Sequence, residues 1–224
     1  MAAAACASCG TAPAVEHVVL LGDSIFDNGV YVRGEPCVHD QLVGALVGTG
    51  GKATLLAVDG DVTADVAGQL ERLPADATHL VVSVGGNDAL RRAAILDHPV
   101  ENTAEVFAEL AAIHDRFRDG YARMLDTVLA HGKPTIVCTI YDSNFAAPKK
   151  ELADVALSVF NDAILRCAGE RGVPVIDLRR IFRTTTDYAN AIEPSAQGGA
   201  KMVAAIVAVV RWHDFEAHRT ALYP

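Results

Sequence analysis

The sequence has 224 residues, of which 51% are hydrophobic and 21% charged, a composition typical of a soluble globular protein with one substantial core. Its 19 Lys and Arg stand against 28 Asp and Glu, so the formal net charge is -9. An acidic chain without a basic cluster argues against nucleic acid and anionic membrane surfaces as partners.

The first 14 residues are predicted to form a flexible tail. They contain no Lys or Arg and no strongly apolar core, so they do not resemble a secretory signal, and we expect a cytoplasmic protein. Cys6 and Cys9 form a Cys-x-x-Cys pair in this tail, but the chain has no second such pair to complete a zinc site. We therefore predict neither a metal nor another cofactor. The most apolar stretch, Met202–Val210, is too short to cross a membrane.

The remaining residues, 15–224, alternate short apolar runs with helical patterns and are predicted to form one domain. The predicted strands are His17–Leu21, Ala53–Val58, Leu80–Val84, Thr135–Ile140 and Val173–Leu178. The predicted helices are about Asp40–Val47, Ala64–Leu73, Glu101–Ala130, Glu151–Glu170 and Ala196–Trp212. Near-continuous Val, Ile and Leu runs are typical of strands buried on both faces, as in a parallel sheet. The fold class is therefore α/β, a three-layer α/β/α sandwich with a five-stranded parallel sheet.

A serine stands directly after the first predicted strand, in the segment Gly22-Asp23-Ser24. Open α/β sheets bind their ligands outside the carboxyl ends of the strands. A serine hydroxyl in that position acts as a nucleophile when a base and an oxyanion site meet it. Ser24 is the candidate nucleophile.

Glycine-rich turns follow the next two strands and supply candidate oxyanion donors. Gly60 follows the second strand and offers a backbone N–H, and Asn87 follows the third strand in Gly85-Gly86-Asn87-Asp88 and offers a side-chain amide. Each turn alone is ordinary turn chemistry. Together, the three strand ends bring a nucleophile and two donors to one edge of the sheet, the arrangement that acyl transfer requires.

These motifs resemble the SGNH or GDSL hydrolase superfamily, from the first strand to the last helix. Gly22-Asp23-Ser24-Ile25 is similar to the nucleophile block, Gly60 to the glycine block, and Gly85-Gly86-Asn87-Asp88 to the Gly-x-Asn-Asp block. The resemblance implies a flavodoxin-like sheet and metal-free hydrolysis of esters, thioesters or related acyl groups. It also implies that the Ser24 N–H, the Gly60 N–H and the Asn87 side chain form the oxyanion hole.

The fourth block of the superfamily, Asp-x-x-His before the final helix, is altered in this chain. Glu193 stands where the base His is expected, and Asn190 stands where the orienting Asp is expected. A solvated Glu, with a pKa near ~4.3, is a weak base, but burial raises its pKa. An Asn amide can donate to a carboxylate, which an Asp beside it cannot do. We predict a Ser24–Glu193 dyad with Asn190 as the orienting residue.

Two alternatives to this dyad remain open. A histidine from elsewhere can supply the base: His17 and His213 are expected at the wrong end of the sheet, whereas His39 and His98 lie in or near loops. Alternatively, the chain is an altered hydrolase that binds a small ligand, or that performs acyl transfer or elimination.

Several further residues are candidates for contact with a small-molecule substrate, the partner that we expect. Asp23 and Asp88 flank the nucleophile and the amide donor, and Tyr141 follows the fourth strand beside Asp142. Arg91 and Arg92 can anchor an anionic group, although exposed loop arginines are the more ordinary interpretation.

Overall fold

A computed structural model describes residues 15–97 and 99–224 of the chain. The tail predicted for residues 1–14, with Cys6 and Cys9, and the candidate His98 lie outside the described residues.

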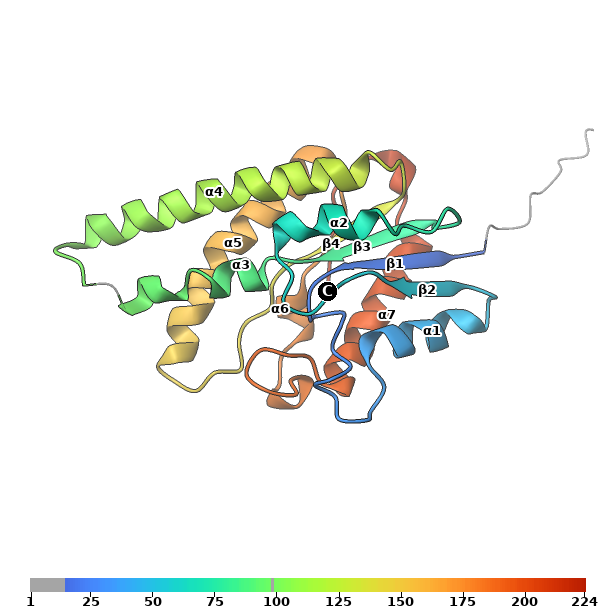
Figure 1. Cartoon of the computed structure of the whole chain (residues 1–224), viewed down its shortest axis with the longest axis horizontal. Coiled ribbons are helices and arrows are strands. Elements are labelled where there is room, and N and C mark those ends of the chain that lie inside the picture. The colour runs from blue at the N-terminus through green and yellow to red at the C-terminus, as the bar shows by residue number, and fades with distance from the viewer. Residues whose placement is uncertain (1–14, 98) are drawn as a thin grey trace, which may run out of the picture.

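The centre of the molecule is a parallel sheet in the order β2-β1-β3-β4-β5-β6 (Figure 1). The strands are β1 (His17–Gly22), β2 (Lys52–Leu55), β3 (His79–Ser83), β4 (Thr135–Cys138), β5 (Val175–Ile176) and β6 (Leu222–Tyr223). The order of the first five strands is flavodoxin-like, and the chain reverses direction across the sheet between β1 and β3. The predicted α/β fold with a parallel sheet is confirmed.

The predicted number of five strands was one too low. Beyond the last long helix, Leu222 and Tyr223 pair with Val175 and Ile176 of β5 at the sheet edge. Two residues are too few to give an alternating pattern in a sequence, so β6 carried no signal.

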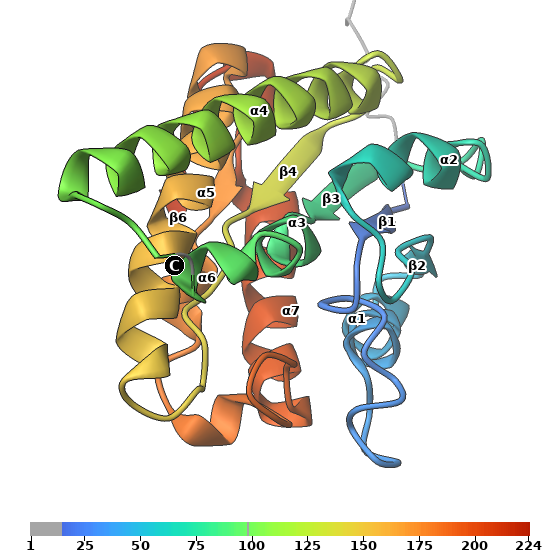
Figure 2. The ribbon, with the colours of Figure 1, turned by 60° about the vertical axis from the view of Figure 1, so that its left-hand side comes forward.

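Helices cover both faces of the sheet and complete the three layers (Figures 1 and 2). They are α1 (Val38–Val47), α2 (Val66–Leu70), α3 (Gly86–Leu90), α4 (Thr103–Leu129), α5 (Lys149–Arg171), α6 (Leu178–Ile181) and α7 (Ala196–Trp212). Short 3-10 turns lie at Thr63–Asp65, Ala93–Asp97, Thr185–Asp187 and Phe215–Ala217. Among the described residues, no helix has both the length and the apolarity that crossing a membrane requires.

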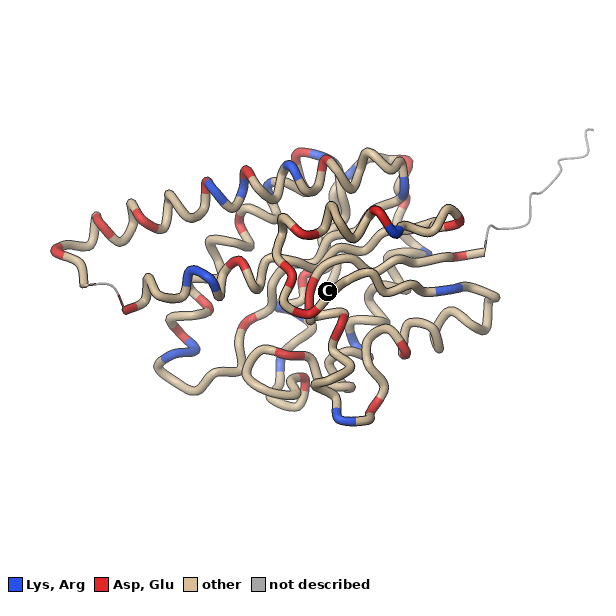
Figure 3. The backbone as a smooth tube through the Cα atoms, viewed as in Figure 1, with Lys and Arg blue, Asp and Glu red and all other residues tan. Residues whose placement is uncertain are grey.

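The central strand β1 shows how the sequence builds two cores. Val18 and Leu20 pack with residues of α1, α6 and α7, whereas Val19 and Leu21 pack with residues of α2, α4 and α5. All four side chains are fully buried, because successive side chains of a strand point to opposite faces and both faces are covered. The charged residues lie outside these cores, and Lys and Arg are scattered along the described chain rather than gathered in one region (Figure 3).

The end of β1 requires a glycine. Gly22 has φ +132°, and a methyl group at this position would overlap the carbonyl oxygen of Ser83 on β3. The absence of a side chain lets the chain turn tightly against β3, and the Asp23 N–H then donates to that same carbonyl at 3.2 Å. The turn places Ser24 at the carboxyl edge of the sheet, beside the point where the strand order reverses.

Candidate active site

Ser24 and Glu193, which are 169 positions apart in sequence, meet at this edge. The Ser24 hydroxyl donates to Oε1 of Glu193 at 3.1 Å. Both residues are almost completely buried, with 6% of Ser24 and 5% of Glu193 exposed. The nucleophile candidate and the carboxylate before α7 therefore form a direct hydrogen bond that bulk water scarcely reaches.

The surroundings of Glu193 make its carboxylate a stronger base than a solvated glutamate. Burial raises its pKa to about 7, and the negative charge of Asp59 acts in the same direction, while the hydrogen bond from Ser24 opposes both. Its second oxygen, Oε2, is buried and has no hydrogen-bond partner in the described part of the chain. A carboxylate with a pKa near neutrality is well suited to accept a proton at neutral pH.

Asn190 acts on the turn that carries Glu193 rather than on its carboxylate. Its Oδ1 accepts from the backbone N–H groups of Ile192 and Glu193, both at 2.9 Å, and the Ala189 N–H donates to the Glu193 carbonyl at 2.8 Å. The expected donation from the Asn190 amide to the Glu193 carboxylate does not occur among the described residues. A short Asn side chain reaches nearby backbone groups readily, and this local bonding competes with a side-chain contact three residues away.

Two buried polar side chains tie the Glu193 turn to the rest of the site. The Tyr141 hydroxyl donates to the Ile192 carbonyl at 2.6 Å. The Asn28 amide donates to the Pro194 carbonyl at 3.2 Å, and Asn28 Oδ1 accepts from the Val38 N–H at the start of α1. These bonds hold Glu193 in place from both sides.

Of the predicted oxyanion donors, Asn87 lies in the same cavity as Ser24 and Gly60 does not. Asn87 stands near the start of α3, and its amide donates to the Asp61 carbonyl at 2.9 Å. An amide has two hydrogens, so one N–H remains for a ligand. Gly60 has φ +88° but is exposed, and it is not part of the cavity wall.

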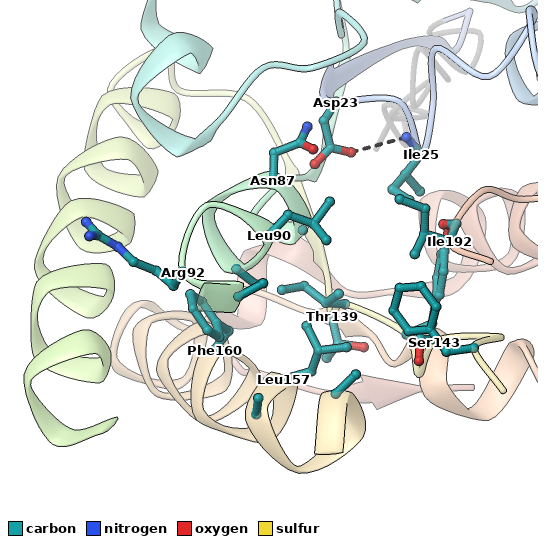
Figure 4. A pocket seen from close by; sticks show the side chains of 18 of the residues that line it. Asp23, Ile25, Asn87, Leu90, Arg92, Thr139, Ser143, Leu157, Phe160 and Ile192 are labelled. Carbon is teal, nitrogen blue, oxygen red and sulfur yellow. Dashed lines mark hydrogen bonds between the residues drawn. The ribbon is translucent and has the colours of Figure 1, made fainter. Parts of the chain in front are cut away.

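The cavity has a volume of about 150 Å³ and carries the candidate catalytic side chains at one end (Figure 4). The polar end carries Asp23, Ser24, Asn87 and Glu193. The rest is walled mainly by apolar side chains, among them Ile25, Leu90, Ile95, Leu96, Leu110, Ile113, Ile140, Leu157, Phe160 and Ile192. Reactive groups at the head of an apolar space suit a substrate with one polar, cleavable end.

Some of the other predicted substrate-binding residues line the cavity, and others lie outside it. Asp23 and Tyr141 are buried and line the cavity, although the Tyr141 hydroxyl is engaged with Ile192. Asp88 lies outside this cavity, where its Oδ2 accepts from the backbone N–H and the hydroxyl of Thr63. Arg92 lines the cavity, whereas Arg91 does not.

Gln69 on α2 is a site residue that sequence reasoning missed. It is buried, and its side chain accepts from the Gly22 N–H at 2.8 Å and donates to the Gly22 carbonyl at 2.7 Å. Its amide also donates to Oδ2 of Asp61. Gln69 thus fixes the turn that presents Ser24. A polar residue on the inner face of a predicted helix was the only signal for it.

None of the described histidines lines the cavity. His213 bonds to the Tyr223 hydroxyl at 2.8 Å, His17 bonds to Asp76 and Thr54, and His39 faces the Ala53 carbonyl. Among residues 15–97 and 99–224, no group of three or more His, Cys, Asp or Glu side chains could hold a metal ion.

Known proteins resemble this chain in sequence profile and in fold. Residues 20–201 match the profile of the GDSL-like lipase/acylhydrolase family. No curated protein sequence matches the chain significantly.

Solved structures share the fold along most of the chain. An acetyl xylan esterase from Geobacillus stearothermophilus is 16% identical, with a TM-score of 0.63, and the match covers 89% of this chain and 96% of the esterase. An extracellular lipase from Streptomyces rimosus is 17% identical, with a TM-score of 0.57 and coverage of 83% and 95%. A phospholipase A1 from Streptomyces albidoflavus is 18% identical, with a TM-score of 0.59 and coverage of 85% and 98%.

At these identities the structural likeness shows the fold. The profile match is the stronger finding, because it extends from β1 into α7 and includes Ser24, Gly60, Asn87 and the altered Glu193 block. The chain belongs to the GDSL-like lipase/acylhydrolase family.

Proposed function

We propose that this protein is a serine hydrolase that cleaves an ester or another acyl substrate through Ser24, with Glu193 as the base. The observation that carries the proposal is the 3.1 Å hydrogen bond from the Ser24 hydroxyl to Glu193 in a site that water scarcely reaches. Family membership supports esterase-type chemistry.

In the first half of the reaction, Glu193 accepts the Ser24 proton as Oγ attacks the substrate carbonyl carbon. The carbonyl electrons move to oxygen, and the remaining Asn87 N–H lies at the same end of the cavity to stabilise that charge. When the carbonyl reforms, the bond to the leaving group breaks, and the leaving group takes the proton from Glu193.

In the second half, a water molecule replaces the leaving group. Glu193 accepts a proton from this water as it attacks the acyl-enzyme, and it returns that proton to Oγ as the acid departs. The same carboxylate therefore acts twice, and each turnover restores its starting state.

The apolar wall supports an apolar acyl group as the part of the substrate that enters the cavity. The wall residues come from α3 and the 3-10 turn after it, from α4 and α5, and from the loops after β1, after β4 and before α7. They follow on from the end of the cavity that holds Ser24 (Figure 4). A polar acyl group would lose hydration against these apolar side chains, although Arg92, Thr139, Ser143 and Lys149 also line the cavity.

Leu157→Trp tests the acyl assignment by filling the cavity. Leu157 lines the apolar wall on α5. We expect kcat/KM for p-nitrophenyl octanoate to fall by about 10- to 200-fold, while the acetate ester changes by less than about threefold. Leu152→Trp is the matched control, because Leu152 lies on the same helix with 54% of its surface exposed. An unchanged octanoate rate, or equal losses for both esters, would contradict an acyl group in this cavity.

A further inference from the structure

The oxyanion side of the site contains fewer donors than the family resemblance implies. Gly60 is exposed and is not part of the cavity wall. One N–H of Asn87 is already engaged with the Asp61 carbonyl. The donors that face the developing charge supply a large part of the rate in acyl transfer, so another donor at this end of the cavity would matter.

Asp23 is a buried carboxyl group at this end of the cavity. It precedes Ser24, lines the same cavity and is 2% exposed. Its Oδ1 accepts from the Ile25 N–H at 3.1 Å, which fixes the orientation of the carboxyl group. Its Oδ2 lies toward α3, about 3.9 Å from the position that a Cβ on Gly86 would occupy. In Figure 4 the Asp23 carboxyl and the Asn87 amide lie close together at the polar end of the cavity.

The charges that act on Asp23 favour its neutral form. They are Glu193 before α7, Asp88 on α3 and Asp59 after β2, and all three are acidic. Burial is the largest cause, and together these effects raise the pKa of Asp23 to about 8, against the opposing Ile25 N–H. Two further titratable groups face Asp23 from the neighbouring strand region, the Cys138 thiol and the Tyr141 hydroxyl, and burial raises the pKa of both. They are therefore uncharged at neutral pH and do not stabilise an Asp23 carboxylate.

We propose that Asp23 is a further catalytic residue, whose neutral carboxyl group donates a hydrogen bond from Oδ2 to the substrate oxyanion. The proposal rests on the proposed function, because it needs an acyl substrate at Ser24. No proton is transferred from Asp23: it stays bonded to Oδ2 while the tetrahedral intermediate forms and collapses. The active enzyme then carries one proton on two carboxyl groups, with Glu193 ionised as the base and Asp23 neutral as the donor.

This assignment predicts a bell-shaped pH dependence of kcat/KM. Glu193 must lose its proton, so activity rises with pH through the apparent pKa near 7. Asp23 must keep its proton, so activity falls again above the apparent pKa near 8. Because the two carboxyl groups interact, the two apparent pKa values of this profile belong to the pair rather than to either residue alone.

Asp23→Asn and Asp23→Ala separate hydrogen-bond donation from a structural role. The Asn amide can accept from the Ile25 N–H and donate from the position of Oδ2, and it does not titrate. We expect Asp23→Asn to remain active on p-nitrophenyl butyrate, to keep the acid limb and to lose the alkaline limb. Asp23→Ala lacks the donor, so we expect its kcat to lie about 10²- to 10³-fold below the wild-type value at the pH optimum, and this difference to shrink above pH 8, where Asp23 itself is ionised.

Thermal unfolding tests whether the Asn variant is folded. Because the pKa of Asp23 is raised from 3.8 to about 8, the folded state loses stability as pH rises between these two values and does not regain it above 8, and an uncharged Asn removes this penalty. We expect Asp23→Asn to unfold at a temperature equal to or above that of the wild-type protein at pH 9.

The alkaline limb decides the proposal. An alkaline limb that persists in Asp23→Asn, or a kcat of Asp23→Ala within about threefold of the wild-type value at the pH optimum, would overturn the role of Asp23. A failure of the proposed function looks different, because the wild-type protein would then show no acid limb near pH 7 and no covalent labelling of Ser24.

Discussion

Replacing Glu193 by Gln is expected to lower kcat by about 10²- to 10⁴-fold and to leave the fold intact. Gln has nearly the same shape, and its amide oxygen can accept from the Ser24 hydroxyl as Oε1 does at 3.1 Å. It cannot take the proton, so the hydroxyl remains a poor nucleophile. Steady-state hydrolysis of p-nitrophenyl butyrate, with a circular dichroism spectrum for the fold, measures both effects.

The matched control for this variant is Glu151→Gln, an exposed carboxylate in the first turn of α5. We expect it to retain the wild-type rate. Burial raises the pKa of Glu193 to about 7, so the wild-type rate should also fall about tenfold for each unit of pH below that value. Full activity in Glu193→Gln would exclude Glu193 as the base.

Ser24→Ala is expected to abolish turnover, with a loss of about 10⁴-fold or more. The variant removes the hydroxyl that donates to Glu193 in the described part of the chain. Because the two residues act as a unit, the double variant Ser24→Ala, Glu193→Gln should be no slower than Ser24→Ala alone.

Comparing the rates of the wild-type protein, the two single variants and the double variant measures the coupling between Ser24 and Glu193. Ser158→Ala is the control, because the Ser158 hydroxyl is exposed on α5. Multiplied losses in the double variant would mean that Ser24 and Glu193 contribute independently. That outcome would contradict the dyad but not the role of Ser24 as nucleophile.

Much of the fold was predictable from β-strand patterning. The uninterrupted apolar run of β1 indicated a strand buried on both faces, and Val18 and Val19 indeed pack into opposite cores. The edge strand β6 was not predictable, because its pairing depends on tertiary contacts. One of these is the hydrogen bond between His213, at the end of α7, and the hydroxyl of Tyr223.

The meeting of Ser24 and Asn87 at one edge of the sheet was predictable, because it follows from strand ends and motif order. Ser24 and Asn87 follow neighbouring strands, and the structure places both in the cavity with Glu193. The contacts of Asn190 and Gln69 were not predictable. Asn190 bonds to its own turn, and Gln69 bonds to backbone atoms of Gly22, 47 residues away, which no sequence motif records.

The most direct test of the Ser24–Glu193 dyad is covalent labelling with a fluorophosphonate, followed by peptide mass spectrometry. In this reaction Oγ attacks phosphorus, fluoride leaves, and the Ser24 proton passes to the base. We predict a single adduct on Ser24, a labelling rate that rises with pH through about 7, and labelling at least about 10²-fold slower in Glu193→Gln. Absence of an adduct on Ser24, or equal labelling rates in the two proteins, would contradict activation of Ser24 by Glu193.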